Sequence, residues 1–484
     1  MIQTTKSLIS SGTERFLVEF GRSSLWQKAR KNPDRVKQVW QKIQTDGLLP
    51  TLEAVFAKLD EPLPLGYCNV GRVLEVGDGA IGYAPGDRVV SNGPHAEIVR
   101  VPKNLCAKIP AGVSDEAASF AVLSAIGLQG IRLLQHGPGD VVAVFGLGLI
   151  GLLSVQILVN SGARVIGIDV SPERLALAKT YGAETVDAVQ GDPVASALAL
   201  SDGHGVDGVL ITASAKDDQI VSQAARMSRK RGKIVLVGVV DLNLNRAEWY
   251  HKELSFQVSC SYGPGRYDPD YEEGGRDYPL PFVRWTEQRN IAAALDFLAR
   301  GRLQTAALTT GRVEHHDAEH AYRLLTSDKN QLGIVLSYPE QVARDGVVTS
   351  DAANEEVSNT ASVKGVGAVR VGVIGTGAFA TRVLLPAIKA TNVRLATAAS
   401  AKGLSAAHAA KKFGFEKARA IPARYWTIRR STPCFWPYVM TSTRIWSATR
   451  SPPASTSSSK NRWLSIERDS IAFARRTTRG PTCR

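Results

Sequence analysis

Cysteine is scarce in this chain and never occurs in CxxC spacing. Among 484 residues the five cysteines are Cys68, Cys106, Cys260, Cys434 and Cys483. An odd number without paired spacing argues against a disulfide framework and for reduced thiols. Long apolar runs are missing too, because residues 1–6 do not resemble a signal peptide and no stretch approaches the length of a membrane span. We therefore expect a cytoplasmic protein without membrane contact.

The basic charge of the chain is concentrated at one end. The net charge is +14, but residues 421–484 hold twelve Lys and Arg against Glu467 and Asp469, which gives +10 there and leaves +4 elsewhere. Four of the eight Trp lie in the same segment, mixed with Arg, Ser, Thr and Pro and without a helical or strand period. A basic arm that binds nucleic acid or anionic membrane is one interpretation, but disordered tails are poor in Trp.

A shifted reading frame explains this tail better. A shifted frame is read by joining the third base of each plausible codon to the first two bases of the next codon. Read in this way, residues 429–443 can give TIDAVLLAVRHDLH and residues 453–465 can give GKHVFVEKPLAL. These strings resemble the Gfo/Idh/MocA family of oxidoreductases, whose EKP motif carries the catalytic lysine. We expect a frameshift between about Ala418 and Arg424, a disordered tail over 421–484, no EKP lysine in this chain and no nucleic-acid partner.

The strongest motif is VVAVFGLGLIG at residues 141–151, where a continuous apolar run enters a GxGxxG turn. An apolar segment of helical length, 152–160, follows. The first glycine permits a tight turn, the second lets the backbone approach a pyrophosphate, and the third allows close packing of helix on strand. We therefore expect cofactor contacts from Gly146, Leu147, Gly148, Leu149, Ile150 and Gly151.

A second predicted strand, 164–168, leads to Asp169, 18 residues after Gly151. A carboxylate at this position accepts hydrogen bonds from the adenosine ribose and repels a 2′-phosphate, so NAD is favoured over NADP. Predicted strands 208–212 and 233–238 fit the same parallel sheet, and Gly238, at the end of the latter, is a further candidate for cofactor binding. The alternative is a Rossmann-like fold that binds another ligand or none.

The flanking segments 66–77, 85–90 and 95–102 alternate apolar and polar residues around glycine turns, as antiparallel barrel strands do. From about Leu8 to Tyr338 the chain resembles the medium-chain dehydrogenase/reductase superfamily. This resemblance implies an α/β protein with a GroES-like β-barrel domain, residues 1–118 and 256–338, and a doubly wound Rossmann domain, residues 119–255. The active site would lie in the cleft between them.

The zinc ligands of that superfamily are not matched. Zinc-dependent members have a cysteine two residues before a threonine, a GHE motif and a later cysteine, where this chain has Ser11, the pair Tyr67 and Cys68, and a cysteine-free segment 120–125. Because catalytic zinc needs three protein ligands, we expect no zinc and no other metal. Thr13 matches the family's relay hydroxyl and Tyr67 stands at a former ligand position, so both are catalytic candidates. Alternatively, Thr13 caps a turn or helix and Tyr67 fills space.

Two further segments bear on the active site. Residues 16–59 have helical apolar spacing, which predicts helices over the cleft. Residues 261–289 are dense in Tyr, Arg and Asp, a composition suited to binding a sugar, carboxylate or phosphate. We take Tyr262, Arg266 and Arg284 as substrate-binding candidates, although a structural role in a domain or subunit contact fits equally well.

Residues 339–367 are polar and small and predict a linker. Residues 368–420 contain a second glycine turn, GxGxxA at 375–380, but the next strand leads to Ser400 and Lys402 rather than to an acid. This organisation resembles bi-domain oxidoreductases, in which a zinc-less medium-chain dehydrogenase precedes a Gfo/Idh/MocA domain. Here that second, partial Rossmann domain has about two βα units, so we expect it to be poorly folded and inactive.

The sequence thus predicts hydride transfer between NAD(H) and a hydroxyl or carbonyl group of a polar, sugar-derived small molecule, without zinc. The alternative is a catalytically inactive nucleotide-binding remnant of a two-domain dehydrogenase. Assembly into a homo-oligomer is compatible with either.

Overall fold

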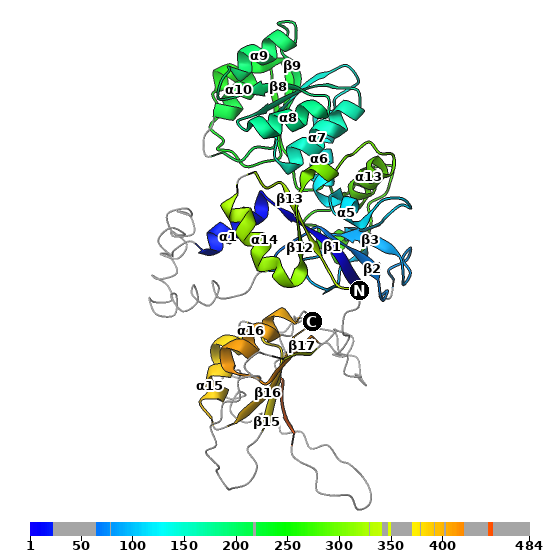
Figure 1. Cartoon of the computed structure of the whole chain (residues 1–484), viewed down its shortest axis with the longest axis vertical. Coiled ribbons are helices and arrows are strands. Elements are labelled where there is room, and N and C mark those ends of the chain that lie inside the picture. Colours follow the sequence, from blue (N-terminus) through cyan, green and yellow to red (C-terminus); the bar gives the residue numbers. More distant parts are fainter. Residues whose placement is uncertain are drawn as a thin grey trace, which may run out of the picture. The chain divides into compact units, whose positions relative to one another are not determined.

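A computed structural model describes residues 1–22, 64–77, 79–215, 219–328, 330–340, 347–349, 370–377, 379–391, 393–400, 403–420 and 444–448. The chain divides into two compact units, Met1–Gly346 and Val347–Arg484 (Figure 1). This division falls inside the segment that the sequence predicted as a linker. Most of the predicted insertion, residues 23–59, lies outside the described residues.

The centre of the first unit's nucleotide-binding part is a six-stranded parallel sheet. Its order is β11-β10-β9-β6-β7-β8, with every neighbouring pair parallel. Counted along the chain this is 3-2-1-4-5-6, the doubly wound order that the sequence predicted. The strands are β6 (Val141–Phe145), β7 (Arg164–Asp169), β8 (Glu184–Asp187), β9 (Val206–Ile211), β10 (Ser228–Leu236) and β11 (Ser255–Val258).

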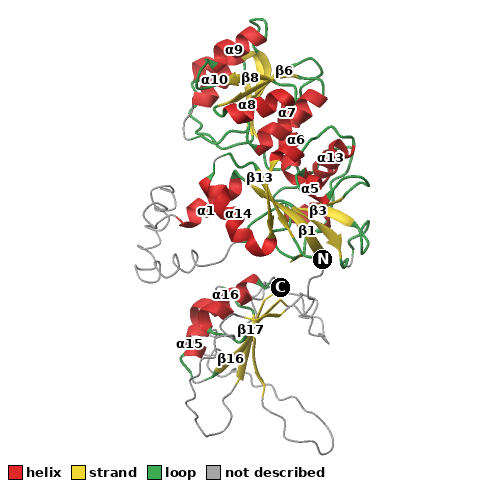
Figure 2. Cartoon of the chain, in the orientation of Figure 1, coloured by secondary structure: helices red, strands yellow, loops and turns green. Residues whose placement is uncertain are grey.

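The apolar run of β6 is continuous because both faces of this sheet are covered. Val142 and Val144 join one hydrophobic core, while Val141, Ala143 and Phe145 join another. Helices flank the strands, as Figure 2 shows. They are α7 (Leu149–Asn160), α8 (Pro172–Thr180), α9 (Pro193–Leu200), α10 (Gln219–Met227) and α11 (Arg246–Tyr250).

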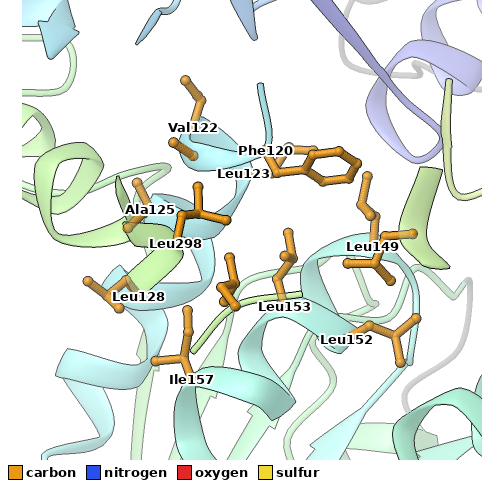
Figure 3. Close-up of a cluster of buried hydrophobic side chains, with 14 of the residues drawn as sticks. Phe120, Val122, Leu123, Ala125, Leu128, Leu149, Leu152, Leu153, Ile157 and Leu298 are labelled. Carbon is orange, nitrogen blue, oxygen red and sulfur yellow. The ribbon is translucent and has the colours of Figure 1, made fainter. Parts of the chain in front are cut away.

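Helices α6 (Ala121–Leu134) and α13 (Glu287–Ala299) extend the first of these cores. Helix α6 packs against both α7 and α13. Figure 3 shows Phe120 and Leu123 at the start of α6, Leu152 and Leu153 from α7, and Leu298 from α13 in one cluster, all of them buried. This packing anchors the helix that begins at the glycine turn.

A mixed seven-stranded sheet combines strands from both ends of the first unit, as expected for a discontinuous domain. Its order is β12-β13-β1-β2-β3-β5, and β4 pairs with β1. Pairing between the end strands β12 and β5, which would close a barrel, is not among the ladders of the described residues. The strands are β1 (Ile2–Ser10), β2 (Asn69–Val73), β3 (Arg88–Ser91), β4 (Ile98–Val99), β5 (Cys106–Lys108), β12 (Thr309–Glu314) and β13 (Gly333–Ser337).

The described part of the first unit contains four further α-helices. They are α1 (Thr13–Arg22), α5 (Asp115–Ala118), α12 (Pro269–Glu272) and α14 (Ala318–Ser327).

The domain boundary expected between residues 255 and 256 needs correction. Strand β11 crosses that point, and its pairing with β10 assigns it to the six-stranded sheet.

The second unit contains a five-stranded sheet in the order β14-β17-β16-β15-β18. Its elements are β14 (Val347–Thr349), β15 (Arg370–Ile374), a π-helical turn (Ala380–Leu384), α15 (Leu385–Lys389), β16 (Arg394–Ser400), α16 (Leu404–Phe413), β17 (Lys417–Ala420) and β18 (Arg444–Ala448). Val373, Leu385, Leu395 and Phe413 belong to its buried core.

Two expectations about this unit differ from the structure. A poorly folded fragment was expected, yet the described elements enclose a packed core. A tail without regular structure was expected, yet β18 lies within it and pairs antiparallel with β15. The rest of residues 421–484 lies outside the described residues. Across the residues that the structure describes, no helix is both long and apolar enough to cross a bilayer.

Candidate nucleotide and active site

The glycine turn after β6 has the tight geometry that the motif predicted. Gly146 has a φ of 86°, and a Cβ placed there would lie 2.6 Å from Cα of Ala213. A Cβ at Gly151 would lie 2.0 Å from the carbonyl oxygen of Gly146. A side chain at either position would therefore collide with backbone, which explains why the turn needs glycine at both.

Gly148 differs, because no atom lies within 4 Å of a Cβ placed there. It precedes α7, and no side chain caps that helix. By contrast, Ser171 caps α8 and Asp192 caps α9 through side-chain oxygens that accept backbone N–H groups. The first-turn amides of α7 therefore face an open side without a protein acceptor, which is the arrangement that binds phosphate oxygens.

The other residues of the turn can contact a ligand through their backbone. The side chains of Leu147 and Leu149 are buried in the hydrophobic core, and Ile150 packs against the same core. Gly238 lies close to the turn, because a Cβ there would be 2.0 Å from the carbonyl oxygen of Ala213, the residue that Gly146 also approaches. All these candidates therefore gather where the strand order reverses between β6 and β9, the usual ligand crevice of a doubly wound sheet.

Asp169 ends β7 and is only 7% exposed. Its Oδ2 accepts the N–H of Leu147 at 2.5 Å, and its Oδ1 accepts the N–H groups of Val170 at 2.8 Å and Ser171 at 2.9 Å. A carboxylate has about four acceptor positions, so one remains for a ribose hydroxyl. Asp169 thus tethers the glycine turn, a role that the sequence motif did not indicate.

Thr212 is a second tether that the sequence analysis missed. Its hydroxyl contacts the carbonyl oxygens of Phe145 at 3.0 Å and Gly146 at 2.5 Å. It therefore fixes the carboxyl end of β6 against that of β9. The clue was present in the sequence, because a hydroxyl residue, Thr212, ends the predicted strand 208–212.

The two catalytic candidates lie together. Thr13 is the first residue of α1 and is exposed, and the Tyr67 hydroxyl donates to Thr13 Oγ1 at 3.4 Å. Burial raises the pKa of the Tyr67 phenol. The phenol therefore keeps its proton at neutral pH, so it can act as a hydrogen-bond donor or acid rather than as a base.

Next to Thr13, the fully buried Glu14 makes three polar contacts. Its Oε1 accepts the N–H of Ser10 at 3.0 Å. Its Oε2 lies 3.0 Å from Nε2 of His95 and accepts the Tyr322 hydroxyl at 2.6 Å. The carboxylate therefore joins β1, the segment around residue 95 and α14.

The network continues beyond His95. Its Nδ1 lies 2.7 Å from Oγ of Ser7, which is 2.9 Å from the Tyr338 hydroxyl. The imidazole also covers Gly66, where a Cβ would lie 2.5 Å from Cδ2 of His95. The Glu14–His95 pair thus ties the segment that carries Thr13 to the residue before Tyr67. Sequence reasoning did not find this network.

The donor set does not fit the zinc of the related dehydrogenases. Ser11 and Tyr67 offer a hydroxyl and a phenol, and Cys68 is fully buried, which raises the pKa of its thiol. Throughout the described ranges, no group of three or more His, Cys, Asp or Glu side chains is placed to hold a metal ion.

Two of the three substrate candidates lie together. The Tyr262 hydroxyl accepts Nδ2 of Asn92 at 3.2 Å, and burial raises the pKa of Tyr262 to about 12. Arg266 pairs with Glu272 at 2.6 Å, and its guanidinium lies 5.4 Å from the Tyr262 ring centroid. Arg284 is elsewhere, stacked 4.0 Å from the ring centroid of Trp285.

The clefts of the nucleotide-binding part do not coincide with these residues. One of about 570 Å³ lies between α10 and residues 243–248, and one of about 500 Å³ lies between β8 and α9. Neither of these two clefts is lined by a candidate residue.

Comparison with known proteins shows similarity to dehydrogenases. A family model described as zinc-binding dehydrogenase matches residues 150–273. The chain is 30% identical to (R,R)-butanediol dehydrogenase of Bacillus subtilis (strain 168) over 222 residues, which are 38% of this chain and 64% of that relative. It is 28% identical to sorbitol dehydrogenase of Halalkalibacterium halodurans over 245 residues, 43% of this chain and 71% of that relative.

A structural match extends further along the chain. The zinc-dependent alcohol dehydrogenase 2 from Streptococcus pneumonia, in its apo form, superposes with a TM-score of 0.52 over 71% of this chain and 92% of that one, at 17% identity. At that identity the match shows a shared fold alone. The alignment with the butanediol dehydrogenase spans less than two thirds of that relative's length. Together the comparisons support a dehydrogenase-like oxidoreductase related to the zinc-binding, medium-chain alcohol dehydrogenase family.

Proposed function

We propose that this chain transfers hydride between NAD(H) and a hydroxyl or carbonyl group of a polar small molecule, such as a polyol or sugar derivative, without zinc. The observation that carries the proposal is the uncapped start of α7 at Gly148 beside the carboxylate of Asp169. The matched relatives are named butanediol and sorbitol dehydrogenases, which supports an alcohol or ketone as substrate.

The preference for NAD rests on Asp169. Its remaining acceptor position suits a ribose hydroxyl, and its negative charge opposes the 2′-phosphate of NADP. The pyrophosphate would be held by the backbone amides after Gly148, at the positive end of α7. When bound, NAD(H) supplies or accepts the hydride.

Proton handling is assigned to Tyr67 and Thr13. In the reducing direction, the protonated Tyr67 phenol donates a hydrogen bond, and then its proton, to the carbonyl oxygen of the substrate. Thr13 lies 3.4 Å from the phenol oxygen and orients it. A neutral donor of this kind stands where zinc-dependent relatives use a Lewis acid.

Turnover is tested by combining the purified chain with NAD+ or NADH and a panel of polyols and ketones, including butanediol, sorbitol and xylulose. We expect turnover with at least one pair, and a loss of about 100-fold or more in the Y67F variant, as is typical when an acid is removed. The control is Y250F, because Tyr250 is 65% exposed. Tight NADH binding without turnover on any substrate would favour the inactive nucleotide-binding remnant instead.

We also propose that the second unit derives from a Gfo/Idh/MocA domain whose frame shifts between about Ala418 and Arg424. The support is the hidden EKP-containing string in residues 453–465 and the turn after β15, where Gly375 has a φ of 93°. Sequencing the gene across codons 415–430 tests this. Codons incompatible with the shifted reading would contradict it.

A further inference from the structure

Two guanidinium groups converge on Trp285. The Arg132 Cζ lies 3.4 Å from its ring centroid and the Arg284 Cζ lies 4.0 Å from it. Arg132 stands in the last turn of α6 and is partly buried, whereas Arg284 is exposed. Nε of Arg132 donates to Oδ1 of Asn290 at 2.8 Å. Both cations therefore stack on the same indole.

Neither cation has an acidic partner among the described residues, since no carboxylate lies within ion-pair distance of Arg132 or Arg284. The surrounding segment makes this unusual, because its other arginines, from residue 262 to 300, all have one. These pairs are Arg266–Glu272, Arg276–Asp270, Arg289–Asp277 and Arg300–Asp296. The positive charge at Trp285 is thus locally uncompensated.

The positive charges of Arg132 and Arg284 also repel each other. Burial and the positive charge of Arg284 lower the pKa of Arg132 to about 10. The carboxyl end of α6 favours a cation at Arg132, but this does not account for Arg284, which lies before the start of α13. An anion at the edge of the indole, within reach of both guanidinium groups, would relieve the repulsion.

We propose that Arg132 and Arg284 bind an oxyanion, a phosphate or carboxylate group of a small metabolite, with Trp285 as the platform that orients them. A guanidinium presents N–H donors in a planar fork that matches both groups, and stacking on an indole fixes that plane. The proposal does not depend on the proposed dehydrogenase activity.

The site is formed by residues other than those of the glycine turn. Leu134, at the end of α6, packs 3.2 Å from a Cβ placed at Gly208, near the start of β9. Gly146 instead lies at the other end of β9, next to Thr212 and Ala213. Gly130, two residues before Arg132, instead packs near the carboxyl ends of β9 and β10, because a Cβ there would lie 2.9 Å from Leu210 and 2.5 Å from Val237. The G148V variant described below therefore distinguishes phosphate bound at Arg132 and Arg284 from phosphate bound at the glycine turn.

Calorimetric titration with inorganic phosphate tests the proposal in the full chain, at neutral pH and with chloride holding the ionic strength constant. We expect saturable binding below about 10 mM. The R132Q and R284Q variants should each weaken it by about tenfold or more, because each removes a charge-assisted contact. The control R300Q, which removes an exposed arginine that pairs with Asp296, should match the wild type within about twofold. A parallel titration with acetate distinguishes phosphate from carboxylate as the preferred group.

Two measurements keep the outcome unambiguous. Arg284 is exposed, so R284Q should unfold at the wild-type temperature and its effect on binding cannot be assigned to misfolding. The G148V variant should lose NADH affinity but keep phosphate binding at Arg132 and Arg284. The proposal is overturned if neither anion binds saturably, if R284Q binds phosphate as the wild type does, or if G148V alone abolishes that binding.

Discussion

The carboxylate of Glu14 and the imidazole of His95 lie 3.0 Å apart in the interior of the first unit, where the Glu14 side chain is 0% exposed and that of His95 is 7% exposed. Around them Ser7, Tyr322 and Tyr338 complete a chain of hydrogen-bonded side chains. Because Thr13 directly precedes Glu14 and His95 covers Gly66, this pair holds the backbone on both sides of the Thr13–Tyr67 contact. The candidate proton-handling residues thus rest on a buried polar network.

The first prediction is that E14Q lowers the stability of the first unit. The substitution removes the buried charge that accepts from Ser10, His95 and Tyr322, so we expect a loss of about 2–4 kcal/mol. The measurement is the urea unfolding midpoint followed by circular dichroism. The control is E319Q, because the Glu319 side chain is 86% exposed. Equal midpoints for the two variants would show that the network does not stabilise the fold.

A second prediction concerns the pH dependence of stability. Glu287 is fully buried, and neither of its carboxylate oxygens has a hydrogen-bond partner. Burial, reinforced by the charge of Glu272, raises the pKa of Glu287 to about 8, while an unfolded glutamate titrates near about 4.3. Between these values the folded state keeps a proton that the unfolded state releases. Stability is therefore lost as the pH rises from about 4.3 to about 8.

The E287Q variant should lack this loss. Its stability relative to the wild type should rise by about 3–4 kcal/mol between about pH 5 and pH 8, as measured by denaturant unfolding at several pH values. The exposed Glu314 provides the control E314Q, which should follow the wild type. If the stability curves of E287Q and the wild type run parallel over this range, Glu287 is not protonated in the fold as described.

A third prediction concerns the contribution of Asp169 to the preference for NADH over NADPH. D169S should weaken NADH binding by about tenfold or more and bring the NADPH affinity close to that for NADH, because the ribose acceptor and the repulsive charge are both removed. Fluorescence titration with each nucleotide measures this. The matched control is D187S, since Asp187 ends β8 and its Oδ1 likewise accepts a backbone N–H, that of Val189 at 2.8 Å. An unchanged ratio of the two affinities in D169S would argue against the NAD preference.

A fourth prediction is that activity does not depend on zinc. Elemental analysis of the purified chain should give less than about 0.1 zinc per chain, because the described residues contain no group of three ligands that could hold the ion. Dialysis against a chelator should leave hydride transfer unchanged. Stoichiometric zinc, lost together with activity on dialysis, would contradict this.

The parts of the site that the sequence predicted are those made by neighbouring residues. The turn at 146–151, the acid at 169 and the parallel strand order follow from one continuous pattern of strand, turn and helix, and the structure brings these residues together. The Glu14 network could not be predicted in this way, because His95 lies 81 residues and Tyr322 lies 308 residues from Glu14. The contacts of Arg284 could not be predicted either, since a segment dense in Tyr and Arg does not reveal which of these side chains lie together.

The second unit shows how strand pairing can compensate for missing elements. Two βα units alone leave sheet edges open, which is the reason to expect poor folding. In the structure, β14 covers β17 and β18 covers β15, both antiparallel. Neither covering strand was predicted, because β14 falls in the predicted linker and β18 in a segment without a strand period.

The central claim, that a dinucleotide lies against the amides that follow Gly148, is tested most directly by NADH titration of G148V. A Cβ at Gly148 has no neighbour within 4 Å, so the variant should fold normally while its side chain blocks the pyrophosphate. The control G77V places the same side chain at another glycine with open space around it. We predict that G148V loses at least about tenfold in NADH affinity, about 1.4 kcal/mol, while G77V binds as the wild type does. Equal affinities for wild type, G77V and G148V would contradict the account.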